Sequence, residues 1–171
     1  MRLFIAINFD DEVKAKLLRA QSALRQVAAS GNFTRLENLH LTLVFLGETS
    51  PGRVGEIRRV MDAAPTRPFT LRFEGIGKFG DTCWVGIQSN PTLAGLYNHL
   101  AQGLKTAGFP IESRPFKPHL TLAREIRLRE STVVAQAEGF PAEVRAIHLM
   151  KSERINGKLI YTSIYEKQII Q

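Results

Sequence analysis

The 171-residue sequence predicts an α+β fold with two pseudo-symmetric lobes, each a mostly antiparallel sheet with outer helices, around a central cleft. Two observations lead to this prediction. Strand-like and helix-like segments follow one another in the same order in both halves of the chain. In addition, the tetrapeptide His-Leu-Thr-Leu occurs once in each half, at residues 40–43 and 119–122. Because 171 residues fit one domain, we expect a single domain, residues 1–171, and the long period indicates a duplicated lobe, with one motif in each copy.

The first half opens with a strand pattern at residues 2–9, RLFIAINF, which is rich in isoleucine, leucine and phenylalanine. Residues 10–30 predict an amphipathic helix, because Asp10 can cap its start and apolar residues recur on one face. That face consists of Val13, Leu17, Ala20, Leu24 and Val27. The other elements predicted in this half are a strand at 38–48, a helix at 52–64 and a strand at 69–79.

The second half repeats this order. Residues 82–89 predict a strand, and residues 90–108 predict a helix that ends at Gly108. The apolar face of this helix has the same offsets as the first one, with Leu93, Tyr97, Leu100, Leu104 and Ala107. The elements expected after it are a strand at 117–126, a weakly indicated helix at 128–137, and strands at 143–152 and 158–170.

Each His-Leu-Thr-Leu string places a histidine and a threonine two residues apart in an apolar strand. Successive strand side chains point to opposite faces, so the imidazole and the hydroxyl of one string share a face. If the lobes face each other about a twofold axis, the two polar faces meet across one cleft. Strict alternation predicts His40, Thr42 and Val44 on one face of the first strand with Leu41, Leu43 and Phe45 on the other, and His119, Thr121 and Ala123 together on the second strand.

Two imidazoles and two hydroxyls in opposed positions suit in-line displacement at phosphorus. One imidazole takes a proton from the attacking oxygen while the other protonates the leaving oxygen, and an unperturbed histidine pKa of roughly 6.5 permits both roles. The threonine hydroxyls can donate to the non-bridging phosphoryl oxygens. We expect no metal and no cofactor, because two histidines with two threonines are a poor zinc-ligand set. The nucleophile elbow G-x-S-x-G and the P-loop are absent from the sequence, and we interpret the glycines of EGIGKFG (74–80) as part of a loop between strands.

Composition favours an anionic partner. The chain carries 23 Lys and Arg against 16 Asp and Glu, a net charge of +7, which suits nucleic acid or a phosphorylated small molecule. We expect no membrane association and a cytoplasmic location, because no apolar run is long enough to span a bilayer and the N-terminus does not resemble a signal peptide. The single cysteine, Cys83, agrees with a reducing compartment. His99 and His148 lack a threonine partner and are predicted to be structural.

The paired strings are similar to the H-x-T-x signatures of the two-histidine (2H) phosphoesterase superfamily. The segments MRLFIAINFDDEV, ENLHLTLVFLGE and RPFKPHLTLAR resemble its LigT-like branch, the RNA 2′,3′-cyclic phosphodiesterases, in order and context across nearly the whole chain. The resemblance implies two pseudo-symmetric α+β lobes around a central active-site cleft. It also implies hydrolysis of an RNA or nucleoside 2′,3′-cyclic phosphate to a 2′-phosphomonoester.

Carried over by motif position, the resemblance implies that His40 is the proton donor and His119 the proton acceptor. It implies that Thr42, Thr121 and Arg124 bind the phosphate. Strict alternation would place Arg124 on the face opposite His119, so Arg124 can contribute only if the strand ends or bulges first. Further candidates are Arg35 and Arg114, each five residues before a motif histidine, at the cleft mouth or as solvated loop charges, and Phe116 and Trp84, for base stacking or for the core.

Two other functions stay open. One is an RNA 2′-5′ ligase acting on tRNA halves, because ligation is the reverse displacement at the same two histidines. The other is a non-catalytic RNA-binding module that keeps the fold and the basic cleft. In each case the expected partners are RNA ends or cyclic nucleotides, and no obligate protein partner is inferred.

Overall fold

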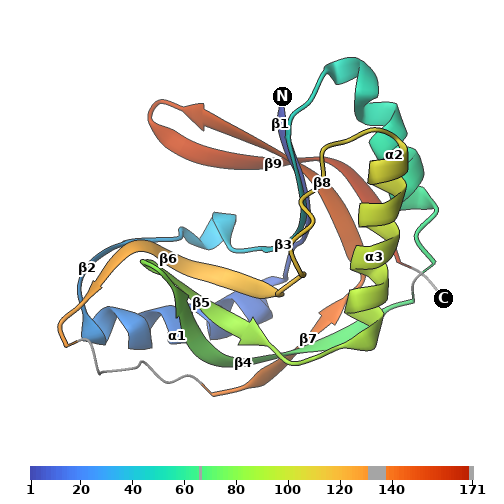
Figure 1. Ribbon diagram of the computed structural model, residues 1–171. Coiled ribbons are helices and arrows are strands. Elements are labelled where there is room, and N and C mark those ends of the chain that lie inside the picture. The colour runs from blue at the N-terminus through green and yellow to red at the C-terminus, as the bar shows by residue number, and fades with distance from the viewer. Residues whose placement is uncertain (66, 131–137, 170–171) are drawn as a thin grey trace.

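A computed structural model describes residues 1–65, 67–130 and 138–169 of the chain (Figure 1). Its strands are β1 (Arg2–Ile7), β2 (Ala28–Phe33), β3 (Leu41–Glu48), β4 (Phe69–Phe79), β5 (Thr82–Ile87), β6 (His119–Leu128), β7 (Phe140–Val144), β8 (Ala146–Ile155) and β9 (Lys158–Gln168). Its helices are α1 (Asp11–Val27), α2 (Val54–Asp62) and α3 (Pro91–Thr106), with short 3-10 turns η1 (Leu36–Asn38) and η2 (Pro51–Arg53).

The strands form two antiparallel sheets. The first sheet has the order β3-β1-β8-β9, and the second has the order β2-β6-β5-β4-β7. Helices α2 and α3 lie together along the first sheet, and α1 lies along the second (Figure 1). This arrangement confirms the predicted α+β class with antiparallel sheets and outer helices.

The two sheets are related by exchange between the halves of the chain. The order β3-β1-β8 in the first sheet corresponds to β6-β5-β4 in the second, so each sheet contains the motif strand of one half and the last long strand of the other. The helices are exchanged as well, since α3 packs against β3 and α1 packs against β6. Neither half of the chain could therefore complete its sheet and helix layer without the other.

Several element boundaries differ from the predictions; the strand predicted at 38–48, for example, begins at Leu41, after the 3-10 turn Leu36–Asn38. Helix α1 ends at Val27, because Ala28–Phe33 pairs with β6 as an edge strand where the apolar period had suggested helix up to residue 30. The strand predicted at 143–152 is two strands, since the chain leaves the second sheet after β7 and enters the first at β8. The helix predicted at 128–137 falls mainly on residues 131–137, which lie outside the described residues; residue 128 ends β6.

One hydrophobic core joins both sheets and the helices, and it includes the leucines that alternate with the motif residues. Leu41, Leu120 and Leu122 are fully buried there. A second, smaller cluster of Phe4, Ala6 and Met150, with Tyr161 packed against it, lies apart from this core. In the described part of the chain, no helix has the length and apolar character needed to cross a membrane.

Candidate active site

The two motif histidines stand at equivalent points, with His40 immediately before β3 and His119 as the first residue of β6. In each ring Nδ1 lies 2.6 Å from the carbonyl oxygen two residues earlier, Asn38 O for His40 and Lys117 O for His119. A carbonyl oxygen can only accept, so Nδ1 carries the hydrogen in both rings. In the neutral form this leaves the Nε2 lone pair of each imidazole available for proton transfer.

The first motif forms its own hydrogen bond. His40 Nε2 lies 2.9 Å from Thr42 Oγ1, so the hydroxyl donates to the neutral ring. In the second motif, Thr121 lies two residues along the same strand from His119, and its carbonyl oxygen accepts from Thr34 Oγ1 at 3.3 Å.

The two motif strands come together although they belong to different sheets. Strand β3 of the first sheet contacts β6 of the second, and Figure 1 shows the start of β6 beside β3. The charge of Arg124 on β6 also acts on the His40 imidazole. The structure therefore brings the two motif strands, which are distant in the chain, into contact.

A β-bulge in each motif strand changes which side chains follow the threonine. On β3, Ala6 of β1 pairs with Thr42 and Ile5 pairs with Val44, which leaves Leu43 as the extra residue. The prediction that Val44 shares the face of Thr42 was therefore wrong: Val44 is 3% exposed in the core, whereas Phe45 is 61% exposed beside Phe4.

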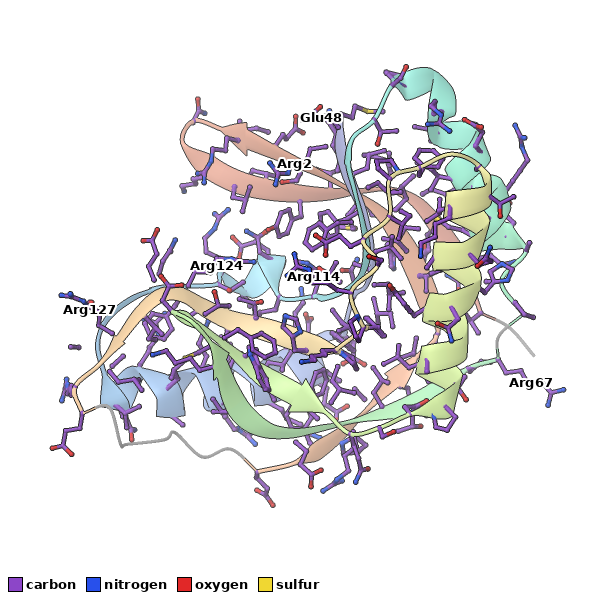
Figure 2. The ribbon with its side chains drawn as sticks, viewed as in Figure 1. Arg2, Glu48, Arg67, Arg114, Arg124 and Arg127 are labelled. Carbon is purple, nitrogen blue, oxygen red and sulfur yellow. The ribbon has the colours of Figure 1, made fainter. Side chains whose placement is uncertain are left out.

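The second motif strand contains the equivalent bulge. Trp84 of β5 pairs with Thr121 and Cys83 pairs with Ala123, so Leu122 is the extra residue. Ala123, expected beside Thr121, is instead fully buried. The bulge returns Arg124 to the face of Thr121, which meets the condition that strict alternation had set. Arg124 is exposed, and Figure 2 shows it between β6 and the β8–β9 hairpin.

Aromatic rings surround both imidazoles. The His40 ring lies 4.9 Å from Phe4 and 5.0 Å from Tyr161, centroid to centroid. The His119 ring lies 5.3 Å from Phe79 and 5.9 Å from Trp84. The sequence analysis did not identify Phe4, Tyr161 and Phe79 as neighbours of the histidines. Each alternates with core residues along its own strand, but this pattern indicates the site only once the strand pairing is known.

The environment of His40 shifts its pKa. Burial lowers the pKa of His40 below its ordinary value, and the Arg124 guanidinium lowers it further, while the hydrogen bond to Asn38 O acts in the opposite direction. Burial and the Arg124 charge therefore both favour the uncharged form of His40 in the free protein. A bound phosphate anion beside the ring would favour the protonated form and offset this shift.

Two further residues tie His40 to the β8–β9 hairpin. Asn38 is 7% exposed, and its Nδ2 donates to Leu159 O at 2.9 Å, while its own carbonyl holds His40. Arg35, a candidate from the sequence, donates to the same Leu159 carbonyl oxygen at 2.5 Å and pairs with Glu37 at 3.2 Å. Arg35 thus anchors the backbone beside the motif.

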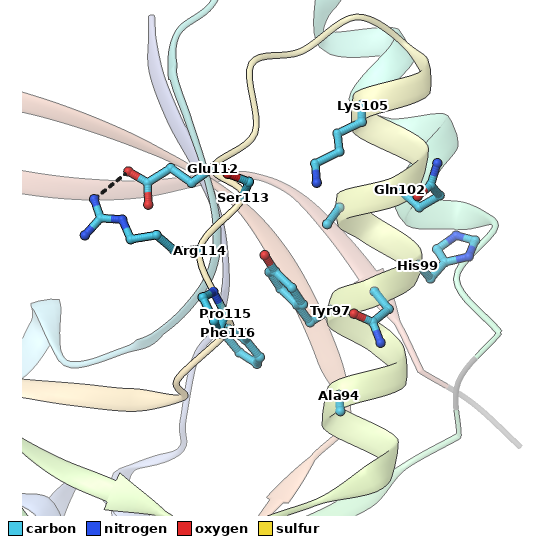
Figure 3. A pocket seen from close by; sticks show the side chains of 12 residues that line it. Ala94, Tyr97, His99, Gln102, Lys105, Glu112, Ser113, Arg114, Pro115 and Phe116 are labelled. Atoms are coloured by element: carbon cyan, nitrogen blue, oxygen red, sulfur yellow. Dashed lines mark hydrogen bonds and ion pairs between the residues drawn. The ribbon is translucent and has the colours of Figure 1, made fainter.

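Arg114, the counterpart of Arg35 in the sequence, is not equivalent to it in space. It pairs with Glu112 at 3.2 Å on the wall of a separate hollow of 770 Å³ between α3 and residues 112–116 (Figure 3). Phe116 stacks on Tyr97 in the same place, with centroids 4.2 Å apart, so it lies against α3 and makes no ring contact with either motif histidine.

The remaining histidines lie on other elements. His99 on α3 is 3.2 Å from Val60 O, and His148 on β8 is 2.9 Å from Ser163 Oγ and 3.9 Å from a Glu166 carboxylate oxygen. Within the described ranges, no three His, Cys, Asp or Glu side chains gather closely enough to hold a metal ion.

The fold has two antiparallel sheets that exchange strands between the halves of the chain, and each motif strand carries one His-x-Thr pair. These features are those of the two-histidine class that the sequence resembles. Residues 10–156 match the sequence pattern of the 2′-5′ RNA ligase superfamily, and the chain belongs to this family. The resemblance to 2H phosphoesterases of the LigT-like branch is thereby confirmed.

Several relatives agree with this placement. The chain is 34% identical over 132 residues to a protein of Archaeoglobus fulgidus named RNA 2′,3′-cyclic phosphodiesterase. The aligned residues cover 72% of each chain. It is 28% identical to a protein of the same name from Methanothermobacter thermautotrophicus, over 96% of each chain. Its fold matches a crystal structure of Escherichia coli LigT complexed with 3′-AMP, with a TM-score of 0.88, 26% identity, and coverage of 99% of this chain and 98% of that one.

Proposed function

We propose that this protein is a metal-independent cyclic phosphodiesterase that hydrolyses the 2′,3′-cyclic phosphate of RNA ends or nucleosides to a 2′-phosphomonoester. One observation carries the proposal: two imidazoles with the same Nδ1–H tautomer, each two residues before a threonine, lie at the starts of motif strands that contact each other. The relatives named RNA 2′,3′-cyclic phosphodiesterase support the same activity.

In the proposed reaction, the cyclic phosphate lies between the two rings. His119 Nε2 accepts a proton from water, whose oxygen forms the new bond to phosphorus. The bond from phosphorus to the ribose 3′ oxygen breaks, and His40 Nε2 donates its proton to that oxygen. Thr42, Thr121 and Arg124 donate to the non-bridging oxygens, where the negative charge is concentrated. The product is a 2′-phosphomonoester with a free 3′ hydroxyl.

The roles of the two histidines are the part of this mechanism that follows from the resemblance. The lowered pKa of His40 favours a neutral ring in the free protein, so its role as proton donor requires that the substrate anion raise its pKa on binding. An aryl phosphodiester such as bis(4-nitrophenyl) phosphate separates the roles, because its leaving group needs no proton. Replacing the donor should then cost much less than replacing the acceptor. A larger loss in His40→Ala than in His119→Ala would reverse the assignment.

The primary test is product analysis on an oligonucleotide that ends in a 2′,3′-cyclic phosphate. We expect a 2′-phosphate end, turnover in EDTA, and losses of about 10² to 10⁴ in kcat for His40→Ala and for His119→Ala. His99→Ala serves as the matched control, because His99 lies on α3 against Val60. A strict requirement for added divalent metal, or full activity in both motif variants, would contradict the proposal.

The family name makes an RNA 2′-5′ ligase the second candidate. Ligation would use the same two histidines, with a ribose hydroxyl in place of water. Adding an oligonucleotide acceptor with a 5′ hydroxyl to the assay distinguishes the two, since a ligase would yield a joined 2′-5′ product. A non-catalytic RNA-binding module would bind the ends without changing them.

We further propose that the partners are RNA ends or cyclic nucleotides and that the location is cytoplasmic. The location is supported by the single cysteine, which agrees with a reducing compartment. Fractionation of cells that express the protein tests it, and recovery from a membrane or exported fraction would contradict it.

A further inference from the structure

Arg2 and Arg154 project from one face of the first sheet, close to each other. Arg2 on β1 pairs with Ser152 on β8, and Ser152 pairs with Tyr161 on β9, so these three side chains share a face. Arg154 lies two residues beyond Ser152 on the same strand, and therefore on the same face. Arg2 and Arg154 are diagonal neighbours across the β1–β8 pair, a relation that places Cα atoms roughly 7 to 8 Å apart. Two long guanidinium side chains at this spacing can reach one anion.

Neither arginine is neutralised by a carboxylate. Among the described residues, neither Arg2 nor Arg154 forms an ion pair. The one hydrogen bond that either guanidinium makes there runs from Arg154 Nη1 to Gly157 O at 3.4 Å. Glu48 lies opposite Arg2 across β1 and β3, but its carboxylate pairs with the N-terminal ammonium at 3.4 Å. Both arginines are exposed to solvent, and Figure 2 shows Arg2 beside the β8–β9 hairpin.

Tyr161, which shares a sheet face with the arginine pair, also contacts the candidate active site. The Tyr161 ring is 5.0 Å from the His40 imidazole and 5.1 Å from Phe4. Burial raises the pKa of the Tyr161 phenol, while the charges of Arg124, Arg2 and Arg154 all lower it. Arg124 belongs to the candidate phosphate site on β6. Arg2 and Arg154 approach the ring from the first sheet.

We propose that Arg2 and Arg154, with the Ser152 hydroxyl between them, bind the 5′-phosphate of the nucleotide whose 2′,3′-cyclic phosphate lies between the histidines. This inference rests on the proposed function. The 5′-phosphate is the next anion along an RNA strand from a terminal cyclic phosphate, and Arg is well suited to bidentate phosphate contact. The subsite makes an RNA end or a 5′-phosphorylated nucleotide a better substrate than a nucleoside cyclic phosphate with a 5′ hydroxyl.

The test uses a pair of substrates that differ in one group, adenosine 2′,3′-cyclic phosphate with a 5′ hydroxyl and with a 5′-phosphate. For the unmodified protein we expect kcat/KM to be about fivefold to tenfold higher with the 5′-phosphate, the range of one charge-assisted contact at a partly exposed site. In Arg2→Gln and Arg154→Gln this ratio should fall toward one. The salt dependence of log kcat/KM should be steeper by about 0.7 for the 5′-phosphorylated substrate, as one added phosphate contact requires.

Arg127→Gln is the matched control. Arg127 is an exposed arginine on β6 that lies away from the hairpin (Figure 2), and its replacement removes the same charge. This variant should keep the ratio of the unmodified protein. A ratio near one in the unmodified protein, or a ratio unchanged in Arg2→Gln and Arg154→Gln, would overturn the subsite.

Binding of the expected products tests the subsite without turnover. Calorimetry should show adenosine 2′,5′-bisphosphate binding more tightly than adenosine 2′-phosphate, with the difference lost in the Arg2 and Arg154 variants. If both compounds bind with this difference but neither cyclic substrate is hydrolysed, the proposed function fails and the subsite stands. If hydrolysis occurs and this difference is absent, the subsite fails and the proposed function stands.

Discussion

Replacing Gly77 by alanine should displace the one tryptophan of the protein. Gly77 on β4 pairs with Trp84 on β5, and the indole lies directly over the glycine. A methyl group built on Gly77 would lie 2.1, 2.4 and 2.6 Å from three ring carbons of Trp84, whereas ordinary contact begins near 3.4 Å. The ring would have to move by about 1.3 Å to restore that contact. Phe79, with its ring centroid 4.8 Å from the indole, limits the space available.

The magnitude follows from this collision. Overpacking of this kind typically costs about 1 to 3 kcal/mol in the free energy of unfolding. In a chain of this length each 1 kcal/mol shifts Tm by roughly 2 to 4 °C, so we expect Gly77→Ala to lower Tm by roughly 2 to 12 °C. The Trp84 ring is 5.9 Å from the His119 ring, and a shift of about 1 Å near a catalytic group can cost up to about 10²-fold in rate.

Gly95→Ala is the matched control, because it is the same substitution in an open site. Gly95 is exposed within α3, and no atom lies within 4 Å of a Cβ built there. Alanine should therefore stabilise the helix by about 0.5 to 1 kcal/mol and raise Tm. Thermal unfolding followed by circular dichroism measures both variants, and fluorescence of Trp84, the single tryptophan, reports its displacement. If Gly77→Ala kept the Tm and the emission of the unmodified protein, the packing argument would be refuted.

Three other outcomes are expected. Asn38→Ala should cost about 1 kcal/mol in unfolding free energy and reduce kcat, because it removes a buried hydrogen bond to Leu159 O beside His40. Chemical denaturation measures the change in unfolding free energy. Arg124→Gln should raise the pKa of His40 in an NMR titration, because a nearby positive charge is lost. The unfolding free energy should fall as pH drops below about 6.5, because burial lowers the folded-state pKa of His40 and His148 and the unfolded chain then binds more protons.

Controls exist for each of these outcomes. Arg127→Gln removes a charge farther along β6 and should leave the His40 titration unchanged. His40→Gln and His148→Gln should each flatten the dependence of Tm on pH between 7.5 and 5.5. Stability that rises on acidification, or a dependence unaffected by both histidine variants, would contradict the pKa argument. Unchanged kcat in Asn38→Ala would show that its carbonyl alone holds His40.

The order of the elements could be predicted from the sequence because each element carries its own local pattern. The apolar period of residues 13–27 matches helix α1, and the alternation around His40 matches β3. Boundaries were less predictable where pairing with a distant strand decided the conformation. Strand β2 forms because Ala28–Phe33 pairs with β6, and the break at Arg145 exists because β7 and β8 belong to different sheets.

The candidate site was predictable in its motif residues and incomplete in its surroundings. His40 and His119 could be singled out because an identical string recurs in both halves. The exposure of Phe45 and Arg124 could not be predicted, since it depends on bulges at Leu43 and Leu122 that exist only relative to β1 and β5. The same holds for Tyr161, which reaches His40 across strands far apart in the chain.

The class of elements, their order and the two His-x-Thr strings could be read from local patterns, because strand alternation and helical period are properties of neighbouring residues. Tertiary packing determined which half supplies the last strand and the covering helix of each sheet. It also determined which side chains after each threonine turn outward, and it placed Arg2, Ser152, Arg154 and Tyr161 on one face of the first sheet. These features depend on register between segments that are distant in the chain, and no local pattern encodes that register.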